Sequence, residues 1–208
     1  HELNARRPAL DAHDSIELPV NGAVHAADDD SVLETAQLHG DLVAQARRDH
    51  PGLPVRLAPA SFLDVPGDWR DGVGTYLAEP PPGPVPPRWH GSLAATWAVA
   101  SAARAVPAGV DELRYFDGRL PPGSPATETV TRLAALRGGD VLAAGAPPPL
   151  AVLAVAGDGP VTLAVANTGP DPVRFRLPDG REAVLPGFAS AWYVLPAGDG
   201  APAGHSPP

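Results

Sequence analysis

Three side chains able to transfer protons lie at or just beyond the ends of expected strands: Glu2, His25 and Asp117. The ordinary pKa of an imidazole is near neutrality, so His25 can act as a general base that activates water. Glu2 can donate a proton or bind substrate, and the Asp117 carboxylate can accept hydrogen bonds from hydroxyl groups. Together they suit a hydrolytic reaction on a hydroxylated substrate.

Each of these residues also has a structural interpretation. Glu2 and Asn4 can form a polar cluster that caps a strand end, and a neighbouring carboxylate can satisfy His25 as an ordinary loop histidine. Asp117 precedes a glycine, which is a common turn pair. The residue types alone therefore leave both interpretations open.

Further candidates for substrate binding are Asp28, Asp29 and Trp89. The two aspartates can contact substrate, orient His25 or cap the helix that follows. Trp89 and Trp69 flank a segment rich in proline and glycine, where they can stack on a sugar ring or anchor the loop. Ser61 lacks the Gly-x-Ser-x-Gly pattern of a nucleophilic serine. No histidine spacing typical of a metal site occurs, so we expect no metal.

The elements that must position these residues alternate along the first part of the chain. Apolar segments at 15–24, 54–63 and 110–116 predict strands, and helices are expected at about 32–48, 92–106 and 125–137. Ser31 and Glu34 have capping-box spacing, whereas Gly40 weakens the first helix, and Ser124 with Pro125 predicts the start of the last one. Such alternation indicates βα units with a parallel sheet.

The pattern changes after Gly139. Five short apolar segments separated by turn residues, at 150–156, 161–167, 173–177, 181–185 and 189–195, predict a small antiparallel β-sandwich. We therefore expect one domain over 1–138, a second over 139–196 and a disordered tail over 197–208, with the helix at 125–137 packed between the two domains.

Composition excludes several classes of partner. The net charge is −9, every one of the 15 basic residues is arginine, and no basic stripe is present, which argues against nucleic acid and anionic membranes. The apolar runs fall well short of the roughly 20 residues needed to cross a membrane. The absence of methionine, together with an opening on His1, predicts that the sequence is the C-terminal part of a longer protein.

Four segments resemble the D-apionate lactonases, bacterial sugar-acid enzymes with a TIM barrel and a C-terminal β-sandwich. The segments are Glu-Leu-Asn-x-Arg-Arg-Pro at 2–8, Asn-Gly-Ala-Val-His-Ala at 21–26, Asp-x-Ser-x-x-Glu-Thr at 29–35 and Tyr-Phe-Asp-Gly at 115–118. The resemblance implies that residues 1–138 are the last four βα units of a (β/α)8 barrel, in which reactive groups lie at the C-terminal ends of strands. It also implies a cytoplasmic bacterial enzyme that acts on a small sugar-acid lactone without a cofactor.

The expected strand at 54–63 distinguishes between two hydrolytic reactions. It ends in Pro-Ala-Ser-Phe at 59–62, where related retaining glycosidases would place a nucleophilic carboxylate. Because a retaining mechanism needs two carboxyl groups about 5 Å apart, lactone opening is favoured. We expect a lactone hydrolase with His25 as base; a TIM-barrel glycoside hydrolase and a non-catalytic carbohydrate-binding fragment remain alternatives.

Overall fold

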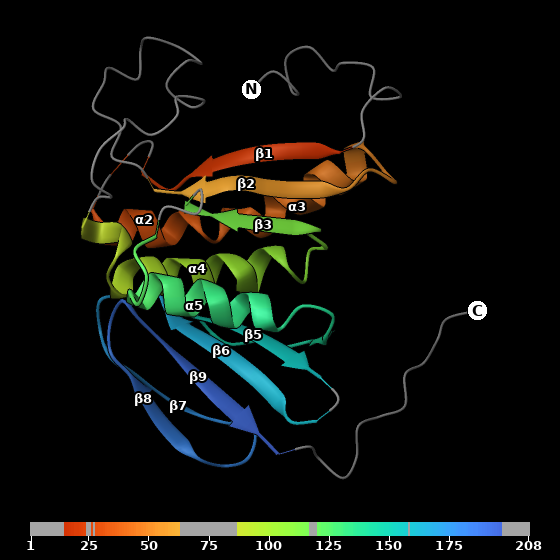
Figure 1. Cartoon of the computed structure of the whole chain (residues 1–208). Coiled ribbons are helices and arrows are strands. Elements are labelled where there is room, and N and C mark those ends of the chain that lie inside the picture. The colour runs from red at the N-terminus through yellow and green to blue at the C-terminus, as the bar shows by residue number, and fades with distance from the viewer. Residues whose placement is uncertain are drawn as a thin grey trace.

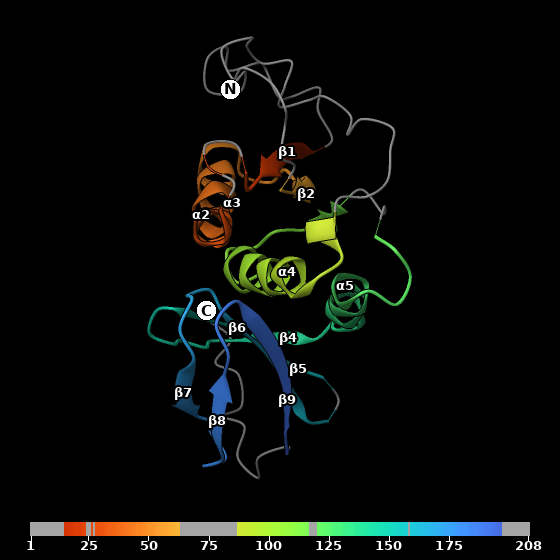
Figure 2. The same ribbon diagram turned by 90° about the vertical axis from the view of Figure 1, so that its left-hand side faces the viewer.

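The structure is built of layers, with a parallel sheet, a group of helices and a pair of antiparallel sheets stacked in that order (Figures 1 and 2). It is a computed structural model that describes residues 15–23, 26, 28–62, 87–116, 120–157 and 159–196. Among these residues no helix has the length and apolar character needed to cross a membrane.

The first layer is a three-stranded sheet made of β1 (Ile16–Asn21), β2 (Val55–Ser61) and β3 (Glu112–Tyr115). Both strand pairs are parallel, in the order β1-β2-β3, which confirms the parallel sheet predicted from the alternation of elements. In Figure 1 the three arrowheads point to the same side of the molecule, so the strand ends share one edge. Within the described residues the sheet does not close into a barrel.

The single helix predicted over 32–48 is wrong, because the structure has two. Helix α2 (Asp29–Thr35) begins three residues earlier than expected and is capped by Asp28 rather than by Ser31. After a break, α3 (Leu38–Asp49) continues. Gly40 lies inside α3, where a Cβ atom would come within 3.0 Å of the Arg104 carbonyl oxygen, so the glycine permits close contact with the next helix.

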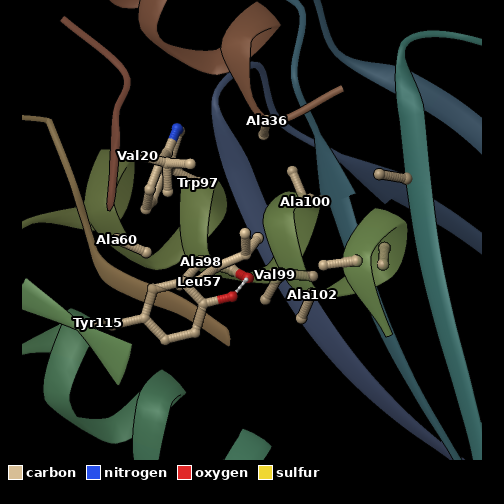
Figure 3. Packing of buried hydrophobic residues seen from close by; sticks show 14 of the residues in the cluster. Val20, Ala36, Leu57, Ala60, Trp97, Ala98, Val99, Ala100, Ala102 and Tyr115 are labelled. Atoms are coloured by element: carbon tan, nitrogen blue, oxygen red, sulfur yellow. Dashed lines mark hydrogen bonds between the residues drawn. The ribbon is translucent and has the colours of Figure 1, made fainter. Parts of the chain in front are cut away.

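Helix α4 (Ser92–Ala105) occupies the centre of the molecule. All of its residues except Ser92 and Arg104 are buried, and it contacts β5, β6 and β9 of the antiparallel layer as well as other helices. Figure 3 shows its residues between Trp97 and Ala102 among core side chains of the parallel sheet. Small alanine side chains let both layers approach the helix closely, so the two sheets share one hydrophobic core.

The helix predicted over 125–137 lies in the layer between the two sheets, which it shares with the more deeply buried α4. Helix α5 (Pro125–Ala135) lies beside α4 and remains partly exposed (Figure 2). Its Arg132 guanidinium lies 5.9 Å from the ring centroid of Trp192 in the antiparallel layer. The predicted start of this helix is confirmed, because Ser124 accepts a hydrogen bond from the Thr127 amide.

All five predicted strands of the second part are present. They are β5 (Leu150–Ala156), β6 (Val161–Asn167), β7 (Val173–Arg176), β8 (Glu182–Leu185) and β9 (Ala189–Leu195). A sixth strand, β4 (Asp140–Leu142), was not predicted, because its three residues are exposed and lack an apolar pattern of useful length. The sheets β4-β5-β6-β9 and β7-β8 enclose a second apolar cluster that includes Leu163, Leu177 and Leu185.

A hydrogen-bonded chain of polar side chains lies inside the main core. Nδ1 of His39, on α3, is 2.8 Å from Oγ of Ser101 on α4, which is in turn 3.1 Å from the Tyr115 hydroxyl at the end of β3. The Tyr115 hydroxyl also donates to the Ala98 carbonyl oxygen at 3.0 Å, the bond drawn in Figure 3. His39 is only 2% exposed, and its ring packs edge-on against Trp97. Burial lowers the pKa of His39 to about 4.

The burial of His39 predicts that the folded protein loses stability in acid. Between its ordinary pKa of 6.5 and the folded value of about 4, only the unfolded chain binds a proton at His39. The free energy of unfolding should therefore fall by about 3 kcal/mol in total as the pH is lowered through that window. Above the ordinary pKa of 6.5, His39 should not change the free energy of unfolding. Urea unfolding at a series of pH values should show this slope, and His39→Gln should reduce it; an identical slope in the variant would contradict the assignment.

Candidate active site

The candidate site lies at the edge of the parallel sheet where β1, β2 and β3 end. Four predicted site residues, Glu2, Asn4, His25 and Asp117, lie outside the described residues, as does Trp69. The geometry of this edge therefore comes from Asp28, Asp29, Ser61 and Trp89 and from their neighbours.

The ends of β1 and β2 are joined by their backbones. The Gly22 amide donates to the Ser61 carbonyl oxygen at 2.8 Å. A Cβ atom on Gly22 would lie 2.8 Å from Thr35 Oγ1, so a side chain at this position would collide with α2. Ser61 is 5% exposed and Phe62 is buried. Over the described residues 55–62, β2 and its end contain no carboxylate, in agreement with the sequence.

Asp28 caps α2 with both of its carboxylate oxygens. Oδ1 accepts the Ser31 amide at 2.9 Å and Oδ2 accepts the Ser31 hydroxyl at 2.8 Å. These two hydrogen bonds, the backbone bond first, lower the pKa of the Asp28 carboxyl. Asp28 is exposed, so it can still face a substrate, but its position is fixed by capping.

Asp29 forms an ion pair that the sequence does not indicate. Its Oδ1 accepts a hydrogen bond of 2.6 Å from Nη2 of Arg88, a residue 59 positions further along the chain. Arg88 belongs to the 3-10 helix η3 (Pro87–Trp89), which precedes α4. Arg88 is not predicted as a site residue, because a single arginine beside a proline-rich segment carries no local sequence pattern. Tertiary folding alone places it at the strand ends.

Trp89 is a core residue, which corrects its prediction as a substrate-stacking side chain. It is 1% exposed, and its Nε1 donates to the Phe62 carbonyl oxygen at 3.0 Å. Its ring lies 5.3 Å from the Phe116 ring, centroid to centroid. No face of the indole is left for a sugar, so the alternative interpretation, that Trp89 anchors the segment before α4, describes the structure.

An aromatic cluster lies directly beneath the strand ends. The Phe116 ring, which follows β3, packs against Phe62, Trp89, Trp97 and Tyr115 with centroid separations between 5.3 and 6.3 Å. Phe116 also has a φ angle of +53°, a left-handed backbone conformation that costs a non-glycine residue about 1 kcal/mol or more. The packing of the fully buried ring in this cluster stabilises that conformation.

A groove of about 810 Å³ runs from the carboxyl end of β1 along α2 and α3. Its polar end is lined by Asn21, Ser31 and Glu34, and Leu38 and Leu42 line the other end. Leu38 is 57% exposed, so the groove is open to solvent, and Gln37 and His39 line it beside the two leucines. The polar end alone adjoins the candidate site.

Among the described residues, no group of three or more His, Asp or Glu side chains is arranged to hold a metal ion. On this edge the Asp28 carboxylate accepts a hydrogen bond from Ser31, and the Asp29 carboxylate forms an ion pair with Arg88. The described residues at this edge therefore contribute carboxylates, an arginine and backbone amides.

Two family models match the sequence. Residues 1–152 match the family model for the D-apionate lactonase TIM barrel domain, and residues 147–193 match the model for its C-terminal immunoglobulin-like domain. A search of proteins with curated descriptions found no match. Since the first of these models covers well over half of the sequence, the chain belongs to the D-apionate lactonase family.

Proposed function

We propose that this protein hydrolyses the lactone of a sugar acid similar to D-apionolactone, at the carboxyl edge of its parallel sheet. The match of residues 1–152 to the D-apionate lactonase TIM barrel domain carries the proposal. In this proposal residues 1–138 supply the last four βα units of the barrel and residues 139–196 the β-sandwich domain. In such barrels the reactive groups lie at the C-terminal strand ends.

In the proposed mechanism the predicted residues have separate roles. His25 removes a proton from water as the water attacks the lactone carbonyl carbon. Glu2 donates a proton or binds substrate, and Asp117 accepts hydrogen bonds from substrate hydroxyls. Asn4, Asp28 and Asp29 bind the remainder of the substrate. The exposed carboxylate of Asp29 follows β1 at the start of α2, which supports its place in this set.

The end of β2 supports lactone opening over glycoside hydrolysis. Ser61 and Phe62 are buried there, and the described part of this strand end offers no nucleophilic carboxylate. A lactone carbonyl needs no such group, because water is the nucleophile and the oxyanion needs only hydrogen-bond donors. The same edge thus favours an ester substrate.

A substrate comparison tests this function. We expect the full-length protein to release acid from D-apionolactone, which pH-stat titration measures, and to leave an aryl glycoside intact. Aryl glycoside hydrolysis without lactone opening would replace the proposal with the glycosidase alternative. Binding of the sugar lactone without turnover of either substrate would instead favour a non-catalytic carbohydrate-binding role.

A further inference from the structure

The guanidinium of Arg88 lies between the start of α2 and Phe62, the residue after β2. Trp89 attaches η3 to the end of β2 through its hydrogen bond to the Phe62 carbonyl oxygen, 3.0 Å long. Arg88 itself reaches Asp29, 2.6 Å away, at the start of the helix that follows β1. Figure 1 shows α2 and the short yellow segment before α4 on the side to which the strand arrowheads point. Arg88 thus connects the start of α2 with the residue that follows β2.

The side chain of Arg88 is held in place by its neighbours and is partly exposed. Its guanidinium carbon lies 5.9 Å from the ring centroid of Phe62, and its Nη2 forms the ion pair with Asp29. The side chain is 29% exposed. A planar guanidinium held by an aromatic ring and a carboxylate is preorganised to bind an oxyanion or a second carboxylate.

The proposed reaction creates negative charge that this edge must accommodate. The described side chains nearest Arg88 include the carboxylate of Asp29, with that of Asp28 beside it in sequence, and the predicted catalytic set adds Glu2 and Asp117. Such an acidic environment repels an oxyanion and a carboxylate product unless a cation is close. Arg88 supplies that positive charge.

We propose that Arg88 is a further catalytic residue, whose guanidinium binds the lactone carbonyl oxygen as it becomes negative and then the product carboxylate. The inference rests on the proposed lactonase function. Water forms a bond to the carbonyl carbon and gives one proton to the base, which leaves a tetrahedral oxyanion facing Arg88. When the oxyanion collapses, the ring C–O bond breaks, the ring oxygen takes the proton from the base, and the acid formed loses its own proton to solvent.

A second arginine–aspartate pair provides a matched control. Arg47 Nη2 lies 2.6 Å from Asp111 Oδ2, the same separation as in the pair of Arg88 with Asp29. This pair lies at the opposite edge of the sheet, where Asp111 accepts the amide of Val55, the first residue of β2, at 2.7 Å. In barrels that edge contributes stability rather than catalysis.

The test compares Arg88→Gln with Arg47→Gln in the complete protein. We expect Arg88→Gln to lower kcat for D-apionolactone by about 10²-fold or more, the usual effect of losing an oxyanion donor. Arg47→Gln should lower the melting temperature and leave kcat per folded molecule near the wild-type value. Added guanidinium, at concentrations too low to denature, should partly restore the rate of Arg88→Ala and have no effect on Arg47→Ala.

Product binding gives a readout that does not depend on turnover. By titration calorimetry, Arg88→Gln should bind D-apionate about tenfold or more weakly than the wild type, consistent with loss of a charge-assisted bond. Equal kcat in the two glutamine variants, together with unchanged D-apionate affinity, would overturn the role of Arg88. A wild-type protein that binds D-apionate but opens no lactone would instead contradict the proposed function and leave the binding comparison to decide on Arg88.

Discussion

Replacement of His25 by alanine is expected to lower the rate of lactone opening by about 10² to 10⁴-fold, the usual effect of removing a general base. His25 is expected at a strand end beside Asp28 and Asp29, where an imidazole can take a proton from water. Its ordinary pKa near neutrality gives the wild-type enzyme an acid limb in the pH profile of kcat/KM. That limb should disappear in the variant. Stopped-flow or pH-stat rates across pH 5 to about 9 measure both effects.

His50→Ala is the matched control for this variant. His50 ends α3, away from the expected catalytic edge, and its backbone amide rather than its ring makes the capping hydrogen bond to the Ala46 carbonyl oxygen. We expect its activity to equal that of the wild type. If His25→Ala retained its rate and its acid limb while its melting temperature fell, His25 would be a structural loop residue and Glu2 would become the leading candidate for the base.

Asn167→Asp is expected to destabilise the immunoglobulin-like domain by about 3 to 5 kcal/mol at neutral pH, because it buries a charge that has no partner. The Asn167 side chain is fully buried at the end of β6. Its Nδ2 donates to three carbonyl oxygens, at 2.8 Å on Asp171, 3.2 Å on Leu185 and 2.9 Å on Pro186, and its Oδ1 accepts the Gly169 amide at 3.1 Å. The Asn167 amide therefore connects the turn after β6 to the turn before β9 through hydrogen bonds.

The carboxylate of the variant would face the same three carbonyl oxygens with no proton to donate. Its pKa in the folded state should be raised, so the loss of stability should be large at neutral pH and smaller once the carboxyl is protonated in acid. Gln45→Glu makes the same amide-to-carboxylate change on the exposed surface of α3 and should alter the free energy of unfolding by less than about 0.5 kcal/mol. Urea unfolding at two pH values measures the free energy of unfolding of both variants. An equal loss of stability in Asn167→Asp and Gln45→Glu would contradict the role of Asn167.

Local sequence patterns predicted most of the individual elements. The alternation of apolar segments with helical periods located β1, β2, β3 and α4, and turn residues separated the five main strands of the second part correctly. Ser124 with Pro125 marked the start of α5 to the residue. These features depend on neighbours within a few positions, so the sequence contains the information directly.

Other features failed because they depend on contacts between distant residues. The capping box at Ser31 and Glu34 has the right spacing, yet Asp28 offers both oxygens to Ser31 and starts the helix earlier. The position of Trp89 beside a proline-rich segment is compatible with sugar stacking as well as with loop anchoring, and only the folded chain places its ring in the aromatic cluster. Strand β4 exists only because β5 provides a partner for its three residues.

For the candidate site, the sequence by itself determined which residue types are available and that three strand ends share one edge. It placed Glu2, His25 and Asp117 among the candidates through residue type and resemblance. Only the tertiary structure decided that Asp29 meets Arg88 across 59 positions of sequence and that α4 is buried between the two sheets. The physical reason is that burial and ion pairing depend on which surfaces come into contact when the chain folds. Contacts between residues far apart in the sequence cannot be predicted from local spacing.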